Sequence, residues 1–172
     1  MSAQWKTERP IVGTRQGLPV AVGDLLTMHK VRSEITDGRM VVIEHTLSSR
    51  RLAAPLHRHS REDEISYVLA GEMTAILGEH VIQAGAGSYV IKPRGQWHTY
   101  WNSGTGDLRL MEIIVPGGFE GCLDCLAEAL DDSGELNVVA RIGAEYGIEF
   151  DFTSVASLCR QFGVALPGWP VA

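Results

Sequence analysis

Two stretches of the sequence decide the fold: His57–Gly71, HRHSREDEISYVLAG, and Gly87–Asn102, GSYVIKPRGQWHTYWN. The first contains two histidines two residues apart and a carboxylate, Glu64, five residues beyond the second of them. The second contains a lone histidine, His98, just after a Pro-x-Gly turn. Three imidazoles and one carboxylate are a borderline-to-hard ligand set that suits a divalent transition metal. We therefore expect the fold to bring these two stretches together around one metal ion.

The spacing within the first stretch restricts how a β protein can present its ligands. Residues two apart on a strand share a face, so His57 and His59 point the same way. Glu64 lies an odd number of steps beyond His59, which on one straight strand places it on the opposite face. A turn or bulge in the polar segment 60–63 would let Glu64 rejoin the histidine face.

Further inward-facing residues follow from the same alternation. Ser66 and Val68 follow Glu64 inward, and Tyr100 shares a face with His98, which must come from another strand. We therefore predict a metal site of His57, His59, Glu64 and His98, with Tyr100, Ser66 and Val68 lining the substrate pocket.

The charge of such a site indicates what it binds. Three neutral imidazoles and one carboxylate around a divalent ion leave a net charge of about +1. This charge favours a mono-anionic ligand, such as a deprotonated enol, phenol or carboxylate. One or two coordination positions stay open for water, substrate or dioxygen. The ligand set accommodates Fe, Mn, Ni, Co, Cu or Zn, and the sequence does not choose among them.

The alternative is that the His57/His59 pair is merely two solvated surface histidines. Against it, a carboxylate and a third histidine follow at spacings that suit a β-hairpin protein. Imidazoles that point into an interior without partners cost several kcal/mol. We therefore prefer the metal site.

Composition restricts the class of protein. The 172 residues suffice for one domain, and the formal charge of −6 without a Lys/Arg cluster argues against nucleic acid and anionic membranes as partners. No apolar run is long enough to span a membrane. Three cysteines do not form a disulfide framework, and the N-terminus lacks the apolar core of a signal peptide. We expect a cytoplasmic protein whose partners are small molecules or proteins.

Hydrophobic patterning divides the chain into three parts. Residues 1–18 form an unpatterned N-terminal arm that could contribute an edge strand, and residues 19–116 contain many short strands separated by Gly and Pro turns, including a hairpin of 24–31 with 40–47. Residues 117–172 show helical periodicity, with helices expected from 119 to 130, 135 to 146 and 154 to 162. We expect these helices to pack on the outside of the β unit, with N-caps at Ser133 and Thr153 and stops at Gly147 and Gly163.

Two cysteines, Cys122 and Cys125, have the CxxC form. Redox chemistry or half a zinc site is possible for this motif, but no second CxxC or nearby histidine completes a zinc set. Cys122 falls on the apolar stripe of the expected helix, which favours a packing role.

The first stretch resembles the first motif of the cupins, G-x5-H-x-H-x3/4-E-x6-G. It matches through His57, His59, Glu64 and Gly71 with the longer spacer. The leading glycine is absent, since Arg51 occupies its place.

The second stretch resembles the second cupin motif, G-x5-P-x-G-x2-H-x3-N, in full. The matching residues are Gly87, Pro93, Gly95, His98 and Asn102. Residues 40–115 as a whole are similar to a one-cupin barrel.

The resemblance implies an all-β fold: a single cupin β-barrel or jelly roll with a short C-terminal helical extension, usually in a homodimer. It carries over His57, His59, Glu64 and His98 as the metal ligands. Within the family, the chain is most similar to bacterial monocupins related to quercetin 2,4-dioxygenase. Cupins also include isomerases, decarboxylases, cyclases and non-enzymatic binders, so the fold leaves the function open.

Three hypotheses follow. The first is a metal-dependent dioxygenase acting on a small enolic or phenolic, flavonol-like substrate, with Glu64 both a ligand and the base that takes the substrate's proton. The second is an oxygen-independent isomerase, cyclase or lyase that uses the metal as a Lewis acid, with Glu64 or Tyr100 moving protons. The third is a small-molecule- or metal-binding protein without enzymatic activity.

Overall fold

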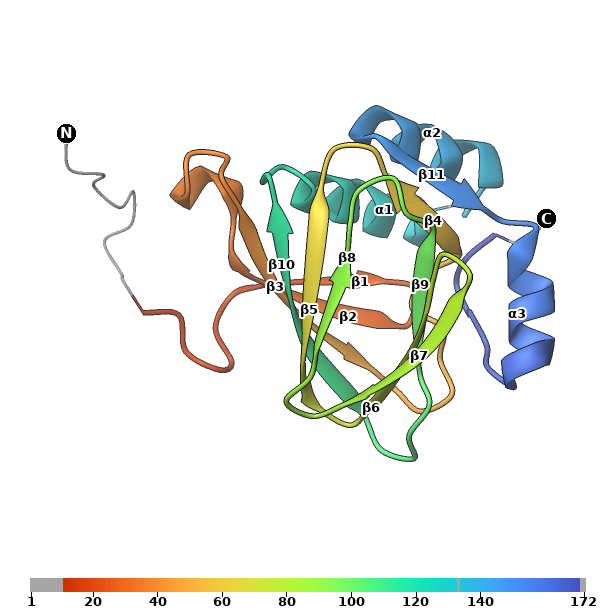
Figure 1. Cartoon of the computed structure of the whole chain (residues 1–172). Coiled ribbons are helices and arrows are strands. Elements are labelled where there is room, and N and C mark those ends of the chain that lie inside the picture. Colours follow the sequence, from red (N-terminus) through yellow and green to blue (C-terminus); the bar gives the residue numbers. More distant parts are fainter. Residues whose placement is uncertain (1–10, 133, 171–172) are drawn as a thin grey trace.

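The computed structural model describes residues 11–132 and 134–170, and it consists of two antiparallel sheets that face each other, with helices at one end and one side (Figure 1). The six-stranded sheet has the order β1-β2-β3-β10-β5-β8. Its strands are β1 (Leu18–Val22), β2 (Leu25–Val31), β3 (Val41–Leu47), β10 (Leu108–Val115), β5 (Asp63–Ala70) and β8 (Tyr89–Lys92).

The five-stranded sheet has the order β11-β4-β9-β6-β7. Its strands are β11 (Ile148–Asp151), β4 (Leu56–His59), β9 (His98–Asn102), β6 (Glu72–Leu77) and β7 (His80–Gly85). A short 3-10 helix, η1 (Ser33–Ile35), and three α-helices complete the fold: α1 (Glu120–Asp132), α2 (Leu136–Tyr146) and α3 (Ser154–Phe162).

The sheets form an open sandwich, so the expectation of a closed barrel is corrected. The consecutive strands β7 and β8 join different sheets, β7 through β6 and β8 through β5. The chain changes sheets at the turn 85–88, where the Ser88 N–H donates to the Gly85 carbonyl at 3.1 Å. Because β7 and β8 do not pair, each sheet keeps a free edge there. The predominantly β fold with a C-terminal helical extension is confirmed.

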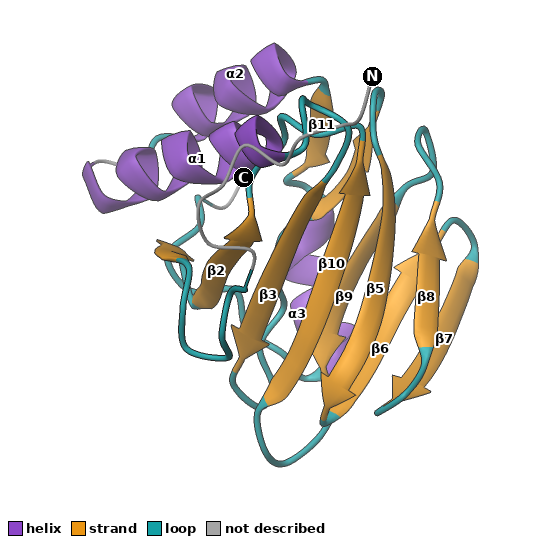
Figure 2. Ribbon diagram, turned by 90° about the vertical axis from the view of Figure 1, so that its left-hand side faces the viewer, coloured by secondary structure: helices purple, strands orange, loops and turns teal. Residues whose placement is uncertain are grey.

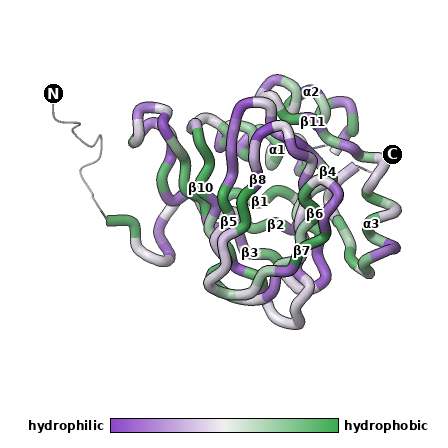
Figure 3. Tube along the Cα trace, in the orientation of Figure 1, coloured by the Kyte–Doolittle hydropathy of each residue, from purple (hydrophilic) through white to green (hydrophobic). Residues whose placement is uncertain are grey.

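Strict alternation of buried and more exposed residues marks the central strands. In β3 and β10, every second residue is buried, as expected for strands with one face on the core. This alternation points His45 inward and Glu44 outward. Hydrophobic segments accordingly lie on the strands, and the turn between β4 and β5 is hydrophilic (Figure 3).

The predicted hairpin between residues 24–31 and 40–47 is confirmed as the antiparallel β2–β3 pair. The predicted turn residues Asp37 and Gly38 both have positive φ, 55° and 74°. Residues 11–17 contain no strand, and β1 begins at Leu18, the last residue of the expected arm. The remainder of that arm, 1–10, lies outside the described residues, and the domain boundaries stay a prediction.

The C-terminal part contains the three expected helices and one strand that was not expected. α2 and α3 end at Gly147 and Gly163, which adopt the left-handed conformation as predicted. Thr153 is at the N-cap position of α3, as predicted, but its side chain makes no capping hydrogen bond. Asp151 Oδ1 accepts hydrogen bonds from the backbone N–H groups of Thr153 and Ser154 in its place. The cap expected at residue 133 lies outside the described residues.

The strand β11 adds to the edge of the five-stranded sheet by pairing with β4. α1 and α2 lie across the adjoining end of the sandwich, and α3 lies on the far side of the five-stranded sheet (Figure 2). There, Trp101 of β9 packs on Phe162 of α3 with ring centroids 4.3 Å apart.

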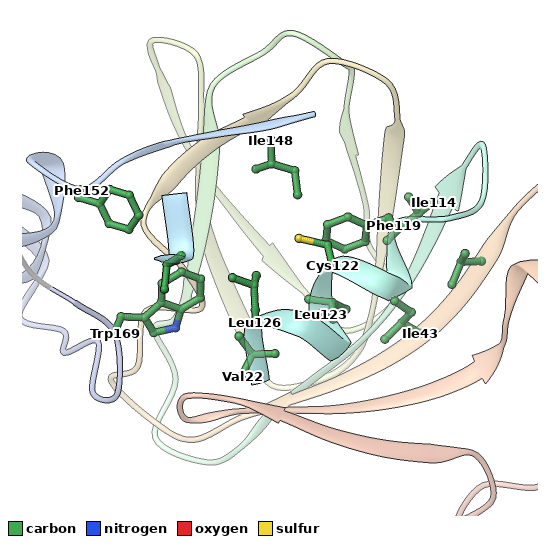
Figure 4. Close-up of a cluster of buried hydrophobic side chains, with 12 residues drawn as sticks. Val22, Ile43, Ile114, Phe119, Cys122, Leu123, Leu126, Ile148, Phe152 and Trp169 are labelled. Carbon is green, nitrogen blue, oxygen red and sulfur yellow. The ribbon is translucent and has the colours of Figure 1, made fainter. Parts of the chain in front are cut away.

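The helices α1 and α2 share one hydrophobic cluster with the two sheets (Figure 4). α1 contributes Cys122, Leu123 and Leu126, and Phe119 immediately precedes this helix. These side chains pack against strand residues such as Ile43 and Ile114. The thiol of Cys122 is fully buried, which agrees with the packing role expected for it. This cluster anchors the helical extension over one end of the sandwich.

Gly71, the last residue of the first stretch, occupies a position that only glycine fits. Its φ is +85°, and a Cβ there would lie 2.6 Å from the carbonyl oxygen of Asp107. We expect Gly71→Ala to lower the free energy of unfolding by about 2 kcal/mol or more, because strain and a backbone clash combine. Gly106→Ala is the control, since a Cβ at Gly106 meets nothing within 4 Å. Urea denaturation of both variants checks this, and equal stabilities would contradict it.

Candidate metal centre

The four predicted ligands converge at the end of the sandwich that α1 and β11 cover. The cluster is compact: one ligand atom from each of His57, His59, Glu64 and His98 lies within 4.8 Å of the others. His57 and His59 come from β4, and His98 from the neighbouring β9, where it pairs directly with His57. These residues could hold a metal ion.

Glu64 reaches the histidines in a different way from the one expected. The segment 60–62 carries the chain from β4 into β5, which belongs to the opposite sheet. Glu64 therefore faces the histidines across the sandwich rather than rejoining their face of one strand. The odd spacing after His59 is the result of this change of sheet.

The Nδ1 atom of each histidine already has an acceptor. His57 Nδ1 lies 2.8 Å from the Pro55 carbonyl oxygen, His98 Nδ1 3.0 Å from that of Gln96, and His59 Nδ1 3.3 Å from Glu62 Oε2. An Nδ1 that faces such an acceptor carries the proton, so the lone pair of a neutral ring is on Nε2.

The Nε2 atoms of His59 and His98 are buried and have no hydrogen-bond partner among the described residues. His98 Nε2 lies 2.9 Å from Glu64 Oε2, so a lone pair on this nitrogen faces a carboxylate oxygen. Buried polar atoms without partners are rare in proteins, and lone pairs directed at one point next to a carboxylate are what a divalent metal requires. The residues therefore fit the ion that the sequence predicts.

A buried lysine holds Glu64 in place. Lys92 Nζ lies 3.0 Å from Glu64 Oε2, and it also pairs with Glu112 Oε1. Burial lowers the pKa of Lys92, but Glu112 and Glu64 outweigh it and raise that pKa above its ordinary value. Burial likewise raises the pKa of Glu64, but Lys92 and then His59 outweigh it and hold the pKa well below 4.5. Both groups are therefore charged at neutral pH.

The polar network continues from Glu112 away from the ligands. Glu112 Oε1 accepts a hydrogen bond of 2.9 Å from Ser66 Oγ, and Oε2 lies 3.4 Å from His45 Nε2. His45 Nδ1 in turn lies 2.9 Å from Thr27 Oγ1. Burial raises the pKa of Glu112, but Lys92 outweighs it and holds the pKa at about 2.

Lys92 and Glu112 were not expected from the sequence to belong to the site. The spacing of the hydrophobic residues did indicate that both side chains face inward. Lys92 is two residues beyond the buried Val90, and Glu112 is two residues from both Leu110 and Ile114, which are buried. Alternation shows that such residues face inward, but only the structure shows that they face each other.

A small cavity adjoins the site. It leaves about 50 Å³ for the centres of water-sized molecules, enough for roughly three to five waters. Tyr100 lines this cavity, at the position that the sequence predicted for it, together with His57, His59, Glu64 and Lys92. Ser66 and Val68 are buried but do not line it, because Ser66 bonds to Glu112 and Val68 packs in a separate hydrophobic cluster. A substrate role for these three residues stays a prediction.

The C-terminal extension forms the roof of this cavity. Phe119 packs edge-on against the His59 ring at 4.9 Å, and Phe150 of β11 lies 5.7 Å from the His57 ring. Leu123, Leu126 and Trp169 complete the roof. The polar lining of the cavity therefore comes from the two sheets, and the extension contributes an apolar roof.

Protons compete with a metal at His59. Burial lowers the pKa of this ring, but Glu64 and Glu62 outweigh it and raise the pKa above 6.5. Burial lowers the pKa of His57 well below 6.5, and the neighbouring His98 and His59 lower it further. As the pH falls, His59 is therefore protonated before His57.

We expect the affinity for zinc to fall as the pH drops from 8 to 6, because a protonated His59 cannot donate its Nε2 lone pair. The loss should begin above pH 6.5, since the pKa of His59 is raised. Competition with a chromophoric chelator over this range measures the affinity. An affinity that stays constant down to pH 5 would contradict the expectation.

Comparisons with known families and structures show what this chain is similar to. Residues 35–114 match the family described as Cupin domain, and the matched span contains all four proposed ligands. The comparison with curated proteins finds no match.

Solved structures with the same fold share little sequence with this chain. A predicted oxalate decarboxylase from Thermotoga maritima has a TM-score of 0.58 and 21% identity, covering 62% of this chain and 98% of that one. An uncharacterized protein with a double-stranded β-helix domain from Klebsiella pneumoniae has a TM-score of 0.55 and 20% identity, covering 64% and 93%. A nucleoside dehydratase from Streptomyces has a TM-score of 0.54 and 14% identity, covering 66% and 87%.

The chain is therefore similar to the Cupin domain family over residues 35–114, and it shares its fold with these solved structures. The narrower resemblance to quercetin 2,4-dioxygenase stays a prediction. Among the described residues, none of the helices is both long and apolar enough to cross a membrane.

Proposed function

We propose that this chain is a metal-dependent cupin enzyme that acts on a compact enolic or phenolic substrate. One divalent transition metal ion would be held by His57, His59, Glu64 and His98. The observation that carries the proposal is the arrangement of the imidazoles, whose Nδ1 atoms all face acceptors while the buried Nε2 atoms of His59 and His98 have no hydrogen-bond partner in the described part of the chain. When bound, the metal supplies a Lewis acid and, if it is redox-active, a centre that reacts with dioxygen.

The cavity supports a smaller substrate than a flavonol. A three-ring flavonol has many more atoms than the few waters that the cavity accommodates. The side chains of Phe119, Phe150 and Trp169 line this space and contribute to its predominantly apolar character. We therefore propose a one-ring or shorter substrate.

The reaction that we propose first is oxidation by dioxygen. An apolar lining suits an apolar gas such as dioxygen, and a four-residue ligand set would leave one or two coordination positions for a deprotonated substrate. Glu64 is proposed as the group that takes the substrate's proton, as the sequence analysis predicted. Its Oε2 is restrained by Lys92, so this role would rest on Oε1, which lies 3.6 Å from His59 Nε2.

One observation favours the oxygen-independent isomerase, cyclase or lyase as the second candidate. The Tyr100 hydroxyl is buried, and within residues 11–132 and 134–170 it has no hydrogen-bond partner. Burial raises the pKa of Tyr100 well above 10, so the hydroxyl keeps its proton and could donate it to a substrate.

Metal analysis paired with an oxygen-electrode screen over compact enols and phenols tests the proposal. We expect about one transition metal ion per chain, and oxygen uptake that Glu64→Ala abolishes and His80→Ala leaves unchanged, because His80 is exposed at the start of β7. Turnover at full rate without oxygen and with zinc would support the second candidate. Protein that neither contains metal nor gains thermal stability on metal addition would favour a binding protein without metal chemistry.

We also propose that the chain forms a homodimer through the outer face of the six-stranded sheet. Val42, Ile113, Ile65 and Ile91 lie in one cross-strand row on this face. At its free edge, Ile91 is 63% exposed and Tyr89 is 68% exposed. Exposed apolar side chains that adjoin one another often mark a contact with another protein chain. Light scattering should give twice the chain mass, and Ile91→Lys should halve it.

A further inference from the structure

The segment 167–170, which we call the tail, places Trp169 against the cavity next to the proposed ligands. We propose that this tail is a lid, which opens beyond Leu166 to give access to the cavity and closes when Trp169 packs back onto the hydrophobic cluster of α1 (Figure 4). The inference rests on the proposed function, because it concerns access to that metal site.

The burial of the proposed ligands requires that a covering element moves. His59 and His98 are each 1% exposed, and Glu64 is 3% exposed. Protein interiors are close-packed, so a ligand larger than water reaches such side chains only when the structure around them opens. Lids that open and close over a site are a common solution to this problem.

Two of the elements around the cavity are firmly held. β11 is hydrogen-bonded to β4 along its whole length. From α1, Asp124 contacts the imidazole of His29 and the guanidinium of Arg32, each at 3.0 Å. Moving either element would break several of these interactions at once, so neither is suited to be the lid.

The tail is held much less firmly. Its last backbone hydrogen bonds to the sheets are at Ala165, whose N–H donates to the Arg50 carbonyl at 3.0 Å and whose carbonyl accepts from the Leu52 N–H at 2.9 Å. Among the described residues, no hydrogen bond ties 167–170 to either sheet or to α1. Segments with few such bonds open at the lowest cost in free energy, so the tail is the element that moves.

Opposing interactions act on the side chain that closes the lid. Trp169 is 8% exposed and packs edge-on against Phe150, with ring centroids 5.6 Å apart. Its indole N–H is buried and has no acceptor in the part of the chain that the structure describes. Burial of the ring favours the closed position, whereas water would satisfy the N–H in the open one. The closed position is therefore only moderately favoured.

Two glycines let the tail close. A Cβ at Gly23, in the turn between β1 and β2, would lie 2.8 Å from the Pro167 carbonyl oxygen and 3.0 Å from Trp169 Cδ1. A Cβ at Gly168 would lie 3.1 Å from Gly23 Cα. A side chain at position 23 should therefore hold the lid open.

Gly23→Asn tests the lid without a change in the tail. The φ of Gly23 is +59°, which asparagine tolerates better than most residues, so the β1–β2 turn should stay intact. In the metal-free protein, the fluorescence emission of Trp169 should shift to longer wavelength as the indole meets water. The spectrum of the corresponding Trp169→Phe variant is subtracted to isolate this emission. Gly38→Asn is the matched control and should cause no shift, since Gly38 has φ +74° and a Cβ there meets nothing within 4 Å.

The second measurement uses zinc as the probe of access. A chromophoric chelator reports the rates at which zinc enters the metal-free protein and leaves the loaded one. Gly23→Asn and Trp169→Ala should raise both rates about ten-fold and leave the dissociation constant unchanged, because an open lid eases passage in both directions. Gly38→Asn and Leu130→Ala should change neither rate, since Leu130 packs against the same cluster but does not line the cavity.

The outcomes separate this inference from the proposed function. Absence of zinc binding would overturn the proposed function, whereas a shifted Trp169 emission would still support a lid over the cavity. An unshifted emission in Gly23→Asn would overturn the lid whether or not zinc binds. Unchanged zinc rates would also overturn it. A change in the release rate alone would do the same, because Trp169 would then be a fixed wall that only stabilises the bound ion.

Discussion

Lys92→Met should lower the free energy of unfolding of the metal-free protein by about 3–5 kcal/mol, the range for removal of one partner from a buried ion pair. Lys92 is 2% exposed and is the cation between the carboxylates of Glu64 and Glu112. Methionine fills a similar volume without the charge, so two buried carboxylates are left without their cation. Urea denaturation at pH 7 measures the loss.

Two further variants show whether the loss comes from charge. Lys92→Met combined with Glu112→Gln removes one of the two uncompensated carboxylates and should recover part of the stability. Arg94→Met breaks the exposed pair with Asp63 and should cost less than about 1 kcal/mol. Equal stability of Lys92→Met and the wild type would contradict a charged, paired Lys92.

The pH dependence of the same variants follows from the pKa of Glu112. In the wild type this pKa is depressed from 4.5 to about 2, so the carboxylate contributes stability above pH 4.5 that is lost as the pH falls towards 2. Without Lys92, the buried carboxylates gain protons at higher pH, which relieves their repulsion. The stability difference between wild type and Lys92→Met should therefore shrink as the pH falls from 7 to 5.

The second large effect concerns the metal. His98→Ala should lower the affinity for zinc by more than about 100-fold, because loss of a hydrogen-bonding partner behind a ligand already costs 10–100-fold. Glu62→Gln, which alters the acceptor behind His59 Nδ1, should fall within that smaller range. His80→Ala is the matched control and should bind zinc as the wild type does.

Thermal denaturation gives an independent readout of the same prediction. Zinc at about 100 times its dissociation constant should stabilise the wild type by about 2.7 kcal/mol. At the same zinc concentration, His98→Ala should show almost no stabilisation. Zinc stabilisation of His98→Ala equal to that of the wild type would show that the ion binds elsewhere.

Local pattern was sufficient for much of this protein. The spacing of the two stretches identified His57, His59, Glu64 and His98, which the structure brings together. Helical periodicity and the glycines at 147 and 163 identified the helices and their ends. These features depend on which residues share a strand face or a helix turn, and that is a property of neighbours in the chain.

Other features depend on which strands become neighbours, and sequence period does not encode that. Only the tertiary structure placed Glu64 in the sheet opposite the histidines and left the two sheets unclosed at β7 and β8. It also paired β11 with β4, which puts Phe150 over His57 and turns the helical extension into the roof of a cavity. The cation between Glu64 and Glu112 is the clearest case. Alternation alone could place Lys92 inside, but a buried charge is stable only beside partners that long-range pairing supplies.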